Sequence, residues 1–299
     1  MASTPPAVPT AGHGYALSPV GEQIMALGER LLGEDLRGRL ARISFHGNEF
    51  GVDRFGFDPN VARYALLFAT FLHRMYFRTE VHDIHRVPQG RVMLIANHSG
   101  QLPFDGFAIG ASMVLDAEPP RMVRSMVERW VQTLPFFSQL FQRCGQIVGV
   151  PENCERLLEM EEAILVFPEG TRGISKTFDQ RYQLADFGLG FMRLALATHC
   201  PIVPVALVGA EEQYINLHDA KTVAKVIGAP TAPVIPQWFI PGLQLPLPVR
   251  YRLYFGEPMT FSGDPDDDDA VIEEKVWVVK ATIQSMLNRG LKERKGLFW

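Results

Sequence analysis

Two polar clusters directly follow apolar stretches of the chain, and their residue types suit proton transfer and anion binding. His98 and Asp105 follow the apolar run 92–96, and Glu169 and Arg172 follow the apolar run 163–167. A histidine steadied by a carboxylate is a common general base near neutral pH. An arginine guanidinium binds phosphate or carboxylate groups through paired N–H donors. The two clusters therefore predict a site that removes a proton from one ligand and binds an anionic group.

The elements around these clusters predict an α/β fold with a mixed, largely parallel sheet flanked by helices. Short continuous apolar runs are typical of fully buried strands, and helices are expected between most of them. We expect strands at 92–96, 121–126, 146–150, 163–167, 202–208 and 250–255, and helices at 106–115, 128–143 and 151–160. Ligands of such sheets bind beyond the carboxyl ends of the strands. His98, Asp105, Glu169 and Arg172 are therefore expected to face one crevice.

The same clusters resemble the motifs of a known family. NHSGQLPFDG from Asn97, FPEGTRG from Phe167 and PIVPV from Pro201 resemble the glycerolipid acyltransferase superfamily, and most of all its monoacylglycerol-acyltransferase-like branch. The resemblance runs from about Gly47 to Gly256. FPEGTR is specific, because six consecutive matches after an apolar strand are rare by chance. Six residues separate His98 from Asp105 where the family has four, which leaves the partner of the histidine open.

The resemblance implies an activity and a set of site residues. Family members move a fatty acyl group from a thioester, acyl-CoA or acyl carrier protein, to a hydroxyl of a lipid acceptor, without a metal or another cofactor. His98 would be the general base and Asp105 would orient it. Substrate binding would fall to Asn97, Ser99, Gly100, Glu169, Gly170, Thr171, Arg172 and Pro204. Backbone N–H groups near Ser99, Gly100 or Gly170 would stabilise the oxyanion.

One departure bears on the acceptor. Members that act on glycerol phosphates carry an arginine shortly after the glycine of a strand between the two motifs, whereas Gln146 follows Gly145 here. This favours a less charged alcohol, such as a monoacylglycerol or diacylglycerol. Arg124, Arg129 and Arg143 remain candidates for a phosphate contact.

Composition limits where the protein acts. Its 299 residues are 47% hydrophobic and 21% charged, as in folded proteins, and the formal charge of −4 gives no global attraction to nucleic acid. Three cysteines without metal-ligand spacing favour a reducing compartment. No apolar stretch reaches the length that spans a bilayer, and the first residues lack a secretory pattern. We expect a cytoplasmic protein that binds the membrane surface peripherally.

The chain divides into four predicted parts. Residues 1–19 form a flexible leader, 20–80 N-terminal helices, 81–260 the acyltransferase domain, and 261–299 a C-terminal helix and tail. The apolar helix expected at 60–77 either packs on the sheet or lies in the membrane interface, with its arginines at lipid headgroups. The proline-rich segment 228–248 is either a packed loop or an apolar lip. Acidic residues at 264–269 favour a helix start over a calcium site.

Two other functions compete with acyl transfer. A hydrolase would use Ser99 or Cys200 as nucleophile, although the G-x-S-x-G motif of such enzymes is missing. A non-catalytic protein that binds lipid or acyl carrier would keep the fold without the chemistry.

Overall fold

A seven-stranded mixed sheet forms the centre of the computed structural model, which describes residues 19–299 except 44, 46, 50, 99–101 and 228–230. Most of the predicted leader thus lies outside the described residues. The strand order is β1-β9-β6-β2-β5-β3-β4. The strands are β1 Glu80–His82, β2 Val92–Ala96, β3 Val123–Val127, β4 Ile147–Val148, β5 Ala163–Val166, β6 Ile202–Val208 and β9 Arg252–Phe255. A separate pair, β7 His218–Asp219 and β8 Pro233–Val234, is antiparallel.

Strand directions make one end of this sheet the place where chain segments converge. β6, β2, β5, β3 and β4 run parallel, with Val92 opposite Ala163 and Met93 opposite Ile202. β9 is antiparallel to β6 and parallel to β1. The predicted α/β class, with its mixed and largely parallel sheet, is confirmed. The carboxyl ends of these five parallel strands consequently lie along one side of the sheet, the carboxyl edge.

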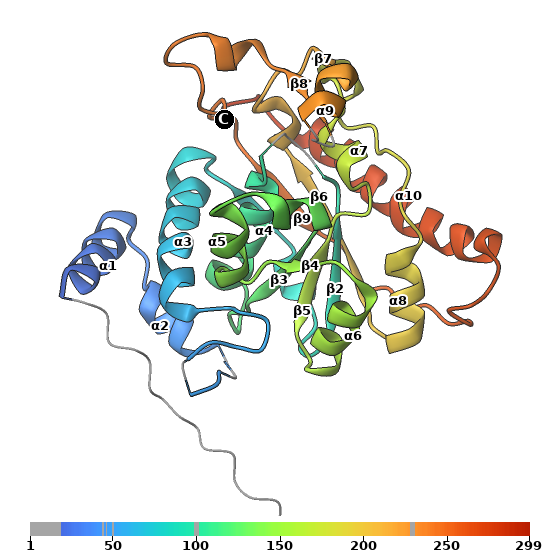
Figure 1. Cartoon of the computed structure of the whole chain (residues 1–299), viewed down its shortest axis with the longest axis horizontal. Coiled ribbons are helices and arrows are strands. Elements are labelled where there is room, and N and C mark those ends of the chain that lie inside the picture. Colours follow the sequence, from blue (N-terminus) through green and yellow to red (C-terminus); the bar gives the residue numbers. More distant parts are fainter. Residues whose placement is uncertain (1–18, 44, 46, 50, 99–101, 228–230) are drawn as a thin grey trace, which may run out of the picture.

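Helices cover both faces of the sheet (Figure 1). Alternate residues of β2 enter different cores: Val92 and Leu94 pack with α4, whereas Met93 and Ile95 pack with α6, α8 and α10. This period of two explains why β2 is apolar throughout. The bounds of these helices are α4 Phe104–Leu115, α6 Pro151–Glu159, α8 Gly190–Thr198 and α10 Asp269–Glu293. α10 begins within the acidic run, as predicted.

The remaining helices are shorter or lie at the margin. α1 Pro19–Leu32 and α2 Leu36–Ala41 pack against α3 and α4 through a small core that includes Met25 and Leu36. The other helices are α3 Pro59–Phe71, α5 Phe137–Arg143, α7 Thr171–Ile174 and α9 Lys221–Ile227.

The single helix predicted at 128–143 is wrong. The chain instead forms a 3₁₀ turn at Arg129–Thr133, and α5 begins only at Phe137. The cause is Pro135, because a proline disfavours the helical conformation of the residue before it, and Leu134 accordingly has ψ 115°.

The helix predicted at 60–77 is neither fully buried nor fully exposed. It comprises α3 and a π-helical turn at Leu72–Tyr76, with Ala69 and Thr70 buried on one side. Apolar side chains on another side remain exposed, namely Tyr64, Phe68, Phe71 and Met75. Its basic residues do not point freely to solvent, since His73 bonds Asp116 and Arg74 pairs with Glu34 and Asp116. Among the described residues, no helix combines the length and apolarity needed to cross a bilayer.

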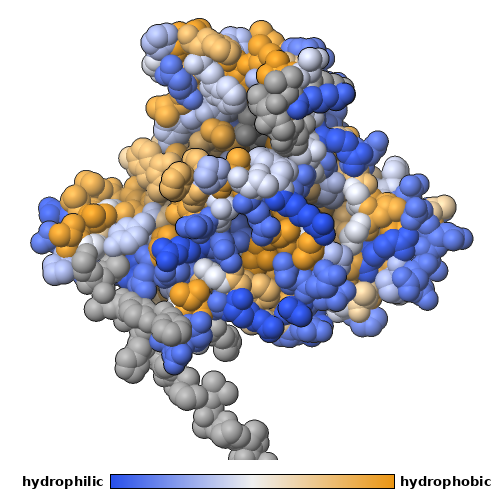
Figure 2. All heavy atoms as spheres, in the orientation of Figure 1, coloured by the Kyte–Doolittle hydropathy of each residue, from blue (hydrophilic) through white to orange (hydrophobic). Residues whose placement is uncertain are grey.

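The described part of the proline-rich segment is packed on one side only. Ile235 and Gln237 are buried, whereas Phe239 and Leu245 are 78% and 68% exposed. Figure 2 shows hydrophobic surface at the top of the molecule, where this segment lies. The segment thus combines features of both predicted alternatives, a packed loop and an exposed apolar lip.

Candidate active site

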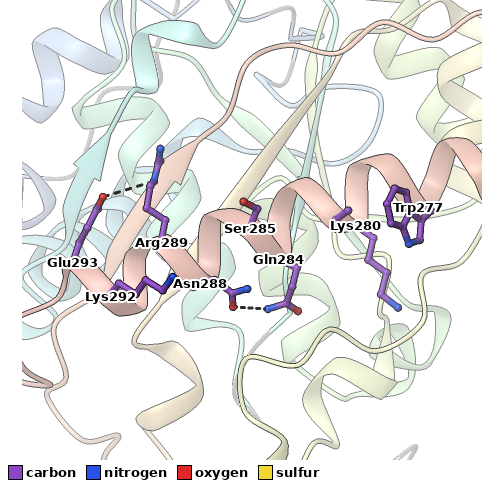
Figure 3. A pocket seen from close by; sticks show the side chains of 9 residues that line it. Trp277, Lys280, Gln284, Ser285, Asn288, Arg289, Lys292 and Glu293 are labelled. Atoms are coloured by element: carbon purple, nitrogen blue, oxygen red, sulfur yellow. Dashed lines mark hydrogen bonds and ion pairs between the residues drawn. The ribbon is translucent and has the colours of Figure 1, made fainter.

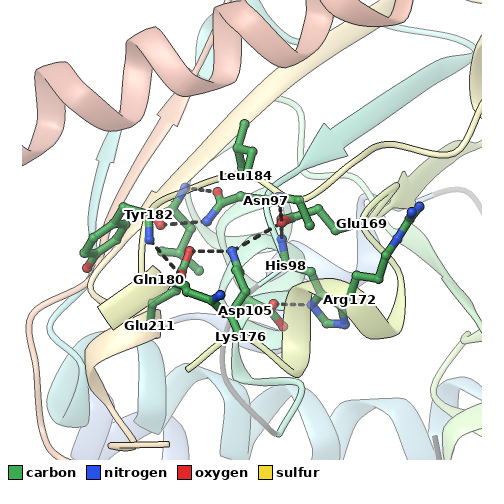
Figure 4. A network of polar contacts seen from close by, with 12 residues as sticks. Asn97, His98, Asp105, Glu169, Arg172, Lys176, Gln180, Tyr182, Leu184 and Glu211 are labelled. Atoms are coloured by element: carbon green, nitrogen blue, oxygen red, sulfur yellow. Dashed lines mark hydrogen bonds and ion pairs between the residues drawn. The ribbon is translucent and has the colours of Figure 1, made fainter. Parts of the chain in front are cut away.

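His98 and Asp105 form a hydrogen-bonded pair at the carboxyl edge of the sheet (Figure 4). His98 follows β2 by two residues, and its Nδ1 lies 2.7 Å from Oδ2 of Asp105. The Asp105 side chain is fully buried in the first turn of α4, where the helix dipole favours a negative charge. Its other oxygen accepts the backbone N–H of Gly106 at 2.7 Å. Asp105 is therefore the partner of His98, in spite of the longer spacing.

The second ring nitrogen of His98, Nε2, is available to accept a proton. When Nδ1–H donates to the Asp105 carboxylate, Nε2 carries the lone pair that can accept a proton. The His98 side chain is 18% exposed, and no described residue bonds Nε2. The pair has the arrangement expected of a general base and the group that orients it.

Two residues that sequence reasoning missed hold the imidazole from the side. The ring of Phe167 stacks on that of His98, with 4.3 Å between centroids and 21° between planes. A Cβ added at Gly173 would lie only 2.7 Å from Cβ of His98, so only glycine fits this approach. Both residues belong to the second motif, FPEGTRG. In the sequence, the final glycine of that motif indicates a close contact, but its spacing alone does not identify His98 as the neighbour.

Glu169 is turned into the protein rather than toward a ligand. It is 1% exposed, and Oε1 accepts the backbone N–H of His98 at 2.9 Å. Oε2 accepts the backbone N–H of Ala185 at 2.7 Å and pairs with Lys176 at 3.2 Å. The predicted role of Glu169 in substrate binding is thus replaced by a role in fixing the backbone of His98.

Arg172 differs from its neighbours in the motif. It lies on α7, its side chain is exposed, and Figure 4 shows the guanidinium extending away from the His98 ring. None of the described acidic residues pairs with it. Gly170, with φ 55° and ψ −142°, adopts a conformation that suits glycine, and the N–H of Thr171 donates to Glu128 at 2.9 Å. Among the described residues, the guanidinium of this motif thus has no carboxylate partner and makes no direct contact with the His98–Asp105 pair, here called the dyad.

Asn97 and Pro204 are structural in this arrangement. The side chain of Asn97 is fully buried, accepts the N–H of Leu207 at 2.8 Å and donates to its carbonyl at 3.2 Å. It fastens the end of β2 to β6. Pro204 is buried inside β6 opposite Ile95, and Gly256 packs closely against its ring. Neither side chain reaches a surface that a substrate could contact.

The predicted oxyanion donors fall on a part of the chain that is only partly described. Ser99 and Gly100, predicted for substrate binding and oxyanion stabilisation, lie outside the described residues. The N–H of Gly170, the third predicted donor, bonds the carbonyl of Phe167 at 3.0 Å. That N–H is therefore already committed within its own turn.

Of the other arginines considered for phosphate binding, Arg124 is unsuitable. Its side chain is 3% exposed and pairs with buried Asp53 at 2.7 Å. Arg129 and Arg143 are exposed. Arg129 follows Glu128, the residue that accepts the N–H of Thr171. Arg129 thus remains a candidate near the second motif.

The cysteine predicted as an alternative nucleophile is remote from the dyad. Cys200 is 2% exposed, and burial raises the pKa of its thiol to about 12. It precedes β6, and the carbonyl of its neighbour Pro201 accepts the N–H of Met93 near the start of β2. Cys200 therefore lies at the opposite end of the sheet from His98.

The fold and the dyad define an α/β protein with a candidate general base at the carboxyl edge, and comparisons with known proteins agree with this class. Residues 78–208 match the family described as Acyltransferase. An uncharacterised protein of Mycobacterium leprae is 36% identical over 84% of this chain and 71% of that protein. A bovine "DGAT1/2-independent enzyme synthesizing storage lipids" is 24% identical over 70% of this chain and 59% of that protein.

Among solved structures, the fold is similar to that of the 1-acyl-sn-glycerophosphate (LPA) acyltransferase PlsC from Thermotoga maritima. The TM-score is 0.51 at 15% identity, over 93% of this chain and 98% of that chain. The present chain belongs to the glycerolipid acyltransferase superfamily, and its activity is acyl-group transfer.

Proposed function

We propose that this protein transfers a fatty acyl group from an acyl thioester, carried by coenzyme A or acyl carrier protein, to a hydroxyl of a lipid acceptor. His98 acts as the general base and Asp105 fixes its tautomer. The observation that carries this proposal is the 2.7 Å contact from Nδ1 of His98 to buried Asp105, which leaves Nε2 without a described partner on a side chain that is 18% exposed.

The dyad serves both halves of the reaction. As the acceptor oxygen attacks the thioester carbonyl, Nε2 takes the hydroxyl proton, and the Asp105 carboxylate stabilises the imidazolium. Collapse of the tetrahedral intermediate re-forms the carbonyl and breaks the C–S bond. The departing thiolate then takes the proton back from Nε2. The ester, the free thiol and neutral His98 result, so protons and electrons balance.

Arg172 is proposed to bind a phosphate of the donor or of the acceptor headgroup. An exposed guanidinium without a described carboxylate partner keeps its N–H donors available for two phosphate oxygens. Gln146, in place of an arginine, favours an acceptor that lacks a phosphate, such as a monoacylglycerol or diacylglycerol. On this proposal the donor supplies the phosphate.

Lipid substrates call for contact with a membrane, and two exposed apolar surfaces support peripheral binding. One is the stripe of Tyr64, Phe68, Phe71 and Met75, and the other is the proline-rich segment around Phe239. The basic residues His73 and Arg74 are engaged by acidic partners within the protein. Peripheral binding would accordingly depend on apolar insertion more than on charge.

The test is an acyl-transfer assay with a labelled acyl chain. Purified protein is given labelled acyl-CoA or acyl carrier protein, with monoacylglycerol, diacylglycerol or lysophosphatidate in mixed micelles, and the lipids are separated. We expect label in a new ester with wild-type protein and far less of it with His98→Ala. Label released as free fatty acid would favour a hydrolase. Tight thioester binding without turnover would favour a binding protein.

A further inference from the structure

A buried lysine, Lys176, bridges two carboxylates that follow the ends of β5 and β6 next to the dyad. The Nζ atom of Lys176 lies 3.2 Å from Oε2 of Glu169, which follows β5, and 3.1 Å from Oε1 of Glu211, which follows β6. The three side chains are 9%, 0% and 4% exposed. Figure 4 shows Lys176 between these carboxylates, on the side of Glu169 away from Arg172. Lys176 was not among the residues predicted to build the site.

Each carboxylate also holds backbone. Glu169 accepts the N–H groups of His98 and Ala185, and Glu211 accepts the N–H of Tyr182 at 2.9 Å. The chain at 182–185 is therefore fixed to both strand ends, and the backbone of His98 is fixed through Glu169. A carboxylate accepts such bonds most strongly when it is ionised.

The cluster of Lys176, Glu169 and Glu211 contains more acidic than basic groups. Two buried carboxylates share a single ammonium group, and burial raises the pKa of Glu211 to about 7. Without Lys176, two uncompensated carboxylates would remain buried near each other, and at least one would take up a proton. The Glu169 bond to the N–H of His98 would then weaken.

A second charged cluster adjoins the first but has cations of its own. The hydroxyl of Tyr182 donates to Glu212 at 2.8 Å, and Glu212 also pairs with Arg294 and, at 3.9 Å, with Arg181. Among the described residues, Lys176 is therefore the cation that pairs with Glu169 and Glu211.

We infer that Lys176 is a positioning residue for acyl transfer. It neutralises the Glu169–Glu211 pair and so holds the backbone of His98 in the reactive geometry. This inference rests on the proposed function. It adds the requirement that Lys176 balance the charges of Glu169 and Glu211, which no sequence motif indicates. It does not require Lys176 to contact a substrate.

The test compares charge-altered variants of the whole chain. Lys176→Met should lower kcat about a hundredfold, because small displacements of a catalytic group cost that much, while KM for the thioester stays within about twofold. Glu211→Gln should keep most activity, since Lys176 then serves Glu169 alone. Lys176→Met combined with Glu211→Gln should recover about tenfold over Lys176→Met, because one buried carboxylate is easier to accommodate than two.

A matched control removes a lysine from a surface ion pair. Lys280 pairs with Asp186 at 3.2 Å, and that aspartate is 87% exposed, so Lys280→Met should leave kcat unchanged. Assays below the melting temperature of the least stable variant separate positioning from unfolding. Wild-type kcat in Lys176→Met, or a double variant no better than Lys176→Met, would overturn the inference.

A second readout keeps the inference separate from the proposed function. NMR of the His98 ring should show shifted or broadened resonances in Lys176→Met and unchanged ones in Lys280→Met. If the wild-type protein transferred no acyl group, the proposed function would fail, and the ring signals would still decide whether Lys176 positions His98. Ring signals identical in Lys176→Met and wild type would contradict the inference.

Discussion

Two surface regions have features of a ligand site, and they differ in the number of elements that build them. A trough of about 810 Å³ runs along α10 and is lined by nine residues of that helix, including Trp277, Ser285 and Arg289 (Figure 3). The carboxyl edge near His98 brings together side chains from the ends of β2, β5 and β6 and from the start of α4. The trough offers room, whereas the edge offers positioned and partly buried charge.

Catalysis is expected at the carboxyl edge rather than in the trough. A catalytic group needs neighbours that fix its orientation and protonation, and such neighbours come from several elements at once. A single helix presents exposed side chains that solvent screens. Acyl transfer should therefore depend on the side chains at the carboxyl edge and be insensitive to substitutions in the trough.

The largest effect is expected at the base itself. His98→Ala should lower acyl transfer by about a hundredfold to ten-thousandfold, the usual contribution of general-base catalysis. Binding of the thioester, measured by calorimetry, should change little. A variant that keeps full activity would move the chemistry away from the edge.

Gly173→Ala should come next, at about a hundredfold. The added methyl would lie 2.7 Å from Cβ of His98 and 3.0 Å from Cβ of Glu169, so the base must shift. Gly110→Ala is the control, because nothing lies within 4 Å of its added methyl in α4. Equal kcat values for the two variants would show that the contact is unimportant.

Arg172→Ala should raise KM for the phosphate-bearing substrate about tenfold, the cost of one lost charge-assisted contact. Arg172→Lys should recover only part of this loss, since lysine lacks the planar fork. Arg289→Ala, in the trough, serves as the comparison. A KM that rises more for Arg289→Ala would reverse the contrast between the two regions.

A smaller effect concerns stability as a function of pH. Burial raises the pKa of Glu211 from 4.5 to about 7, so between these pH values the folded protein holds a proton that the unfolded chain has released. The stability from this group is complete below about pH 4.5 and is lost as the pH rises through about 7.

Glu211→Gln should remove that dependence. Its free energy of unfolding, relative to wild type, should therefore increase from pH 5 to pH 8 in urea titrations. Glu274→Gln, at an exposed position on α10, should show no such trend. A relative stability that stays constant from pH 5 to pH 8 would mean that Glu211 is ionised throughout this range.

The smallest effects are expected in the trough. Trp277→Ala and Ser285→Ala alter exposed side chains of α10, so kcat and KM should stay within about twofold of wild type, as is usual for surface substitutions. A loss of activity comparable to that of Gly173→Ala would show that the trough binds a substrate.

Much of the fold could be predicted because its central strands are apolar without interruption. β2 and β6 have the predicted bounds, 92–96 and 202–208. β1 was missed because its three residues, Glu80–His82, lie at the sheet edge and include two polar side chains. Local pattern identifies buried strands well and short edge strands poorly.

The site was less predictable, because the sequence gives residue types without directions. Asp105 was predicted beside His98, and the structure places it there. Glu169 was expected to face a substrate but is turned inward. Lys176 carries no motif signal, since its importance comes from two carboxylates that fold toward it from distant strands.

The most direct test of the account is a double-variant cycle at the dyad. Initial rates of acyl transfer are measured for wild type, His98→Ala, Asp105→Asn and the two combined. Because Asp105 acts through the imidazole, the double variant should be no slower than His98→Ala alone. If the two losses instead multiply, Asp105 acts independently of His98, and the dyad mechanism is contradicted.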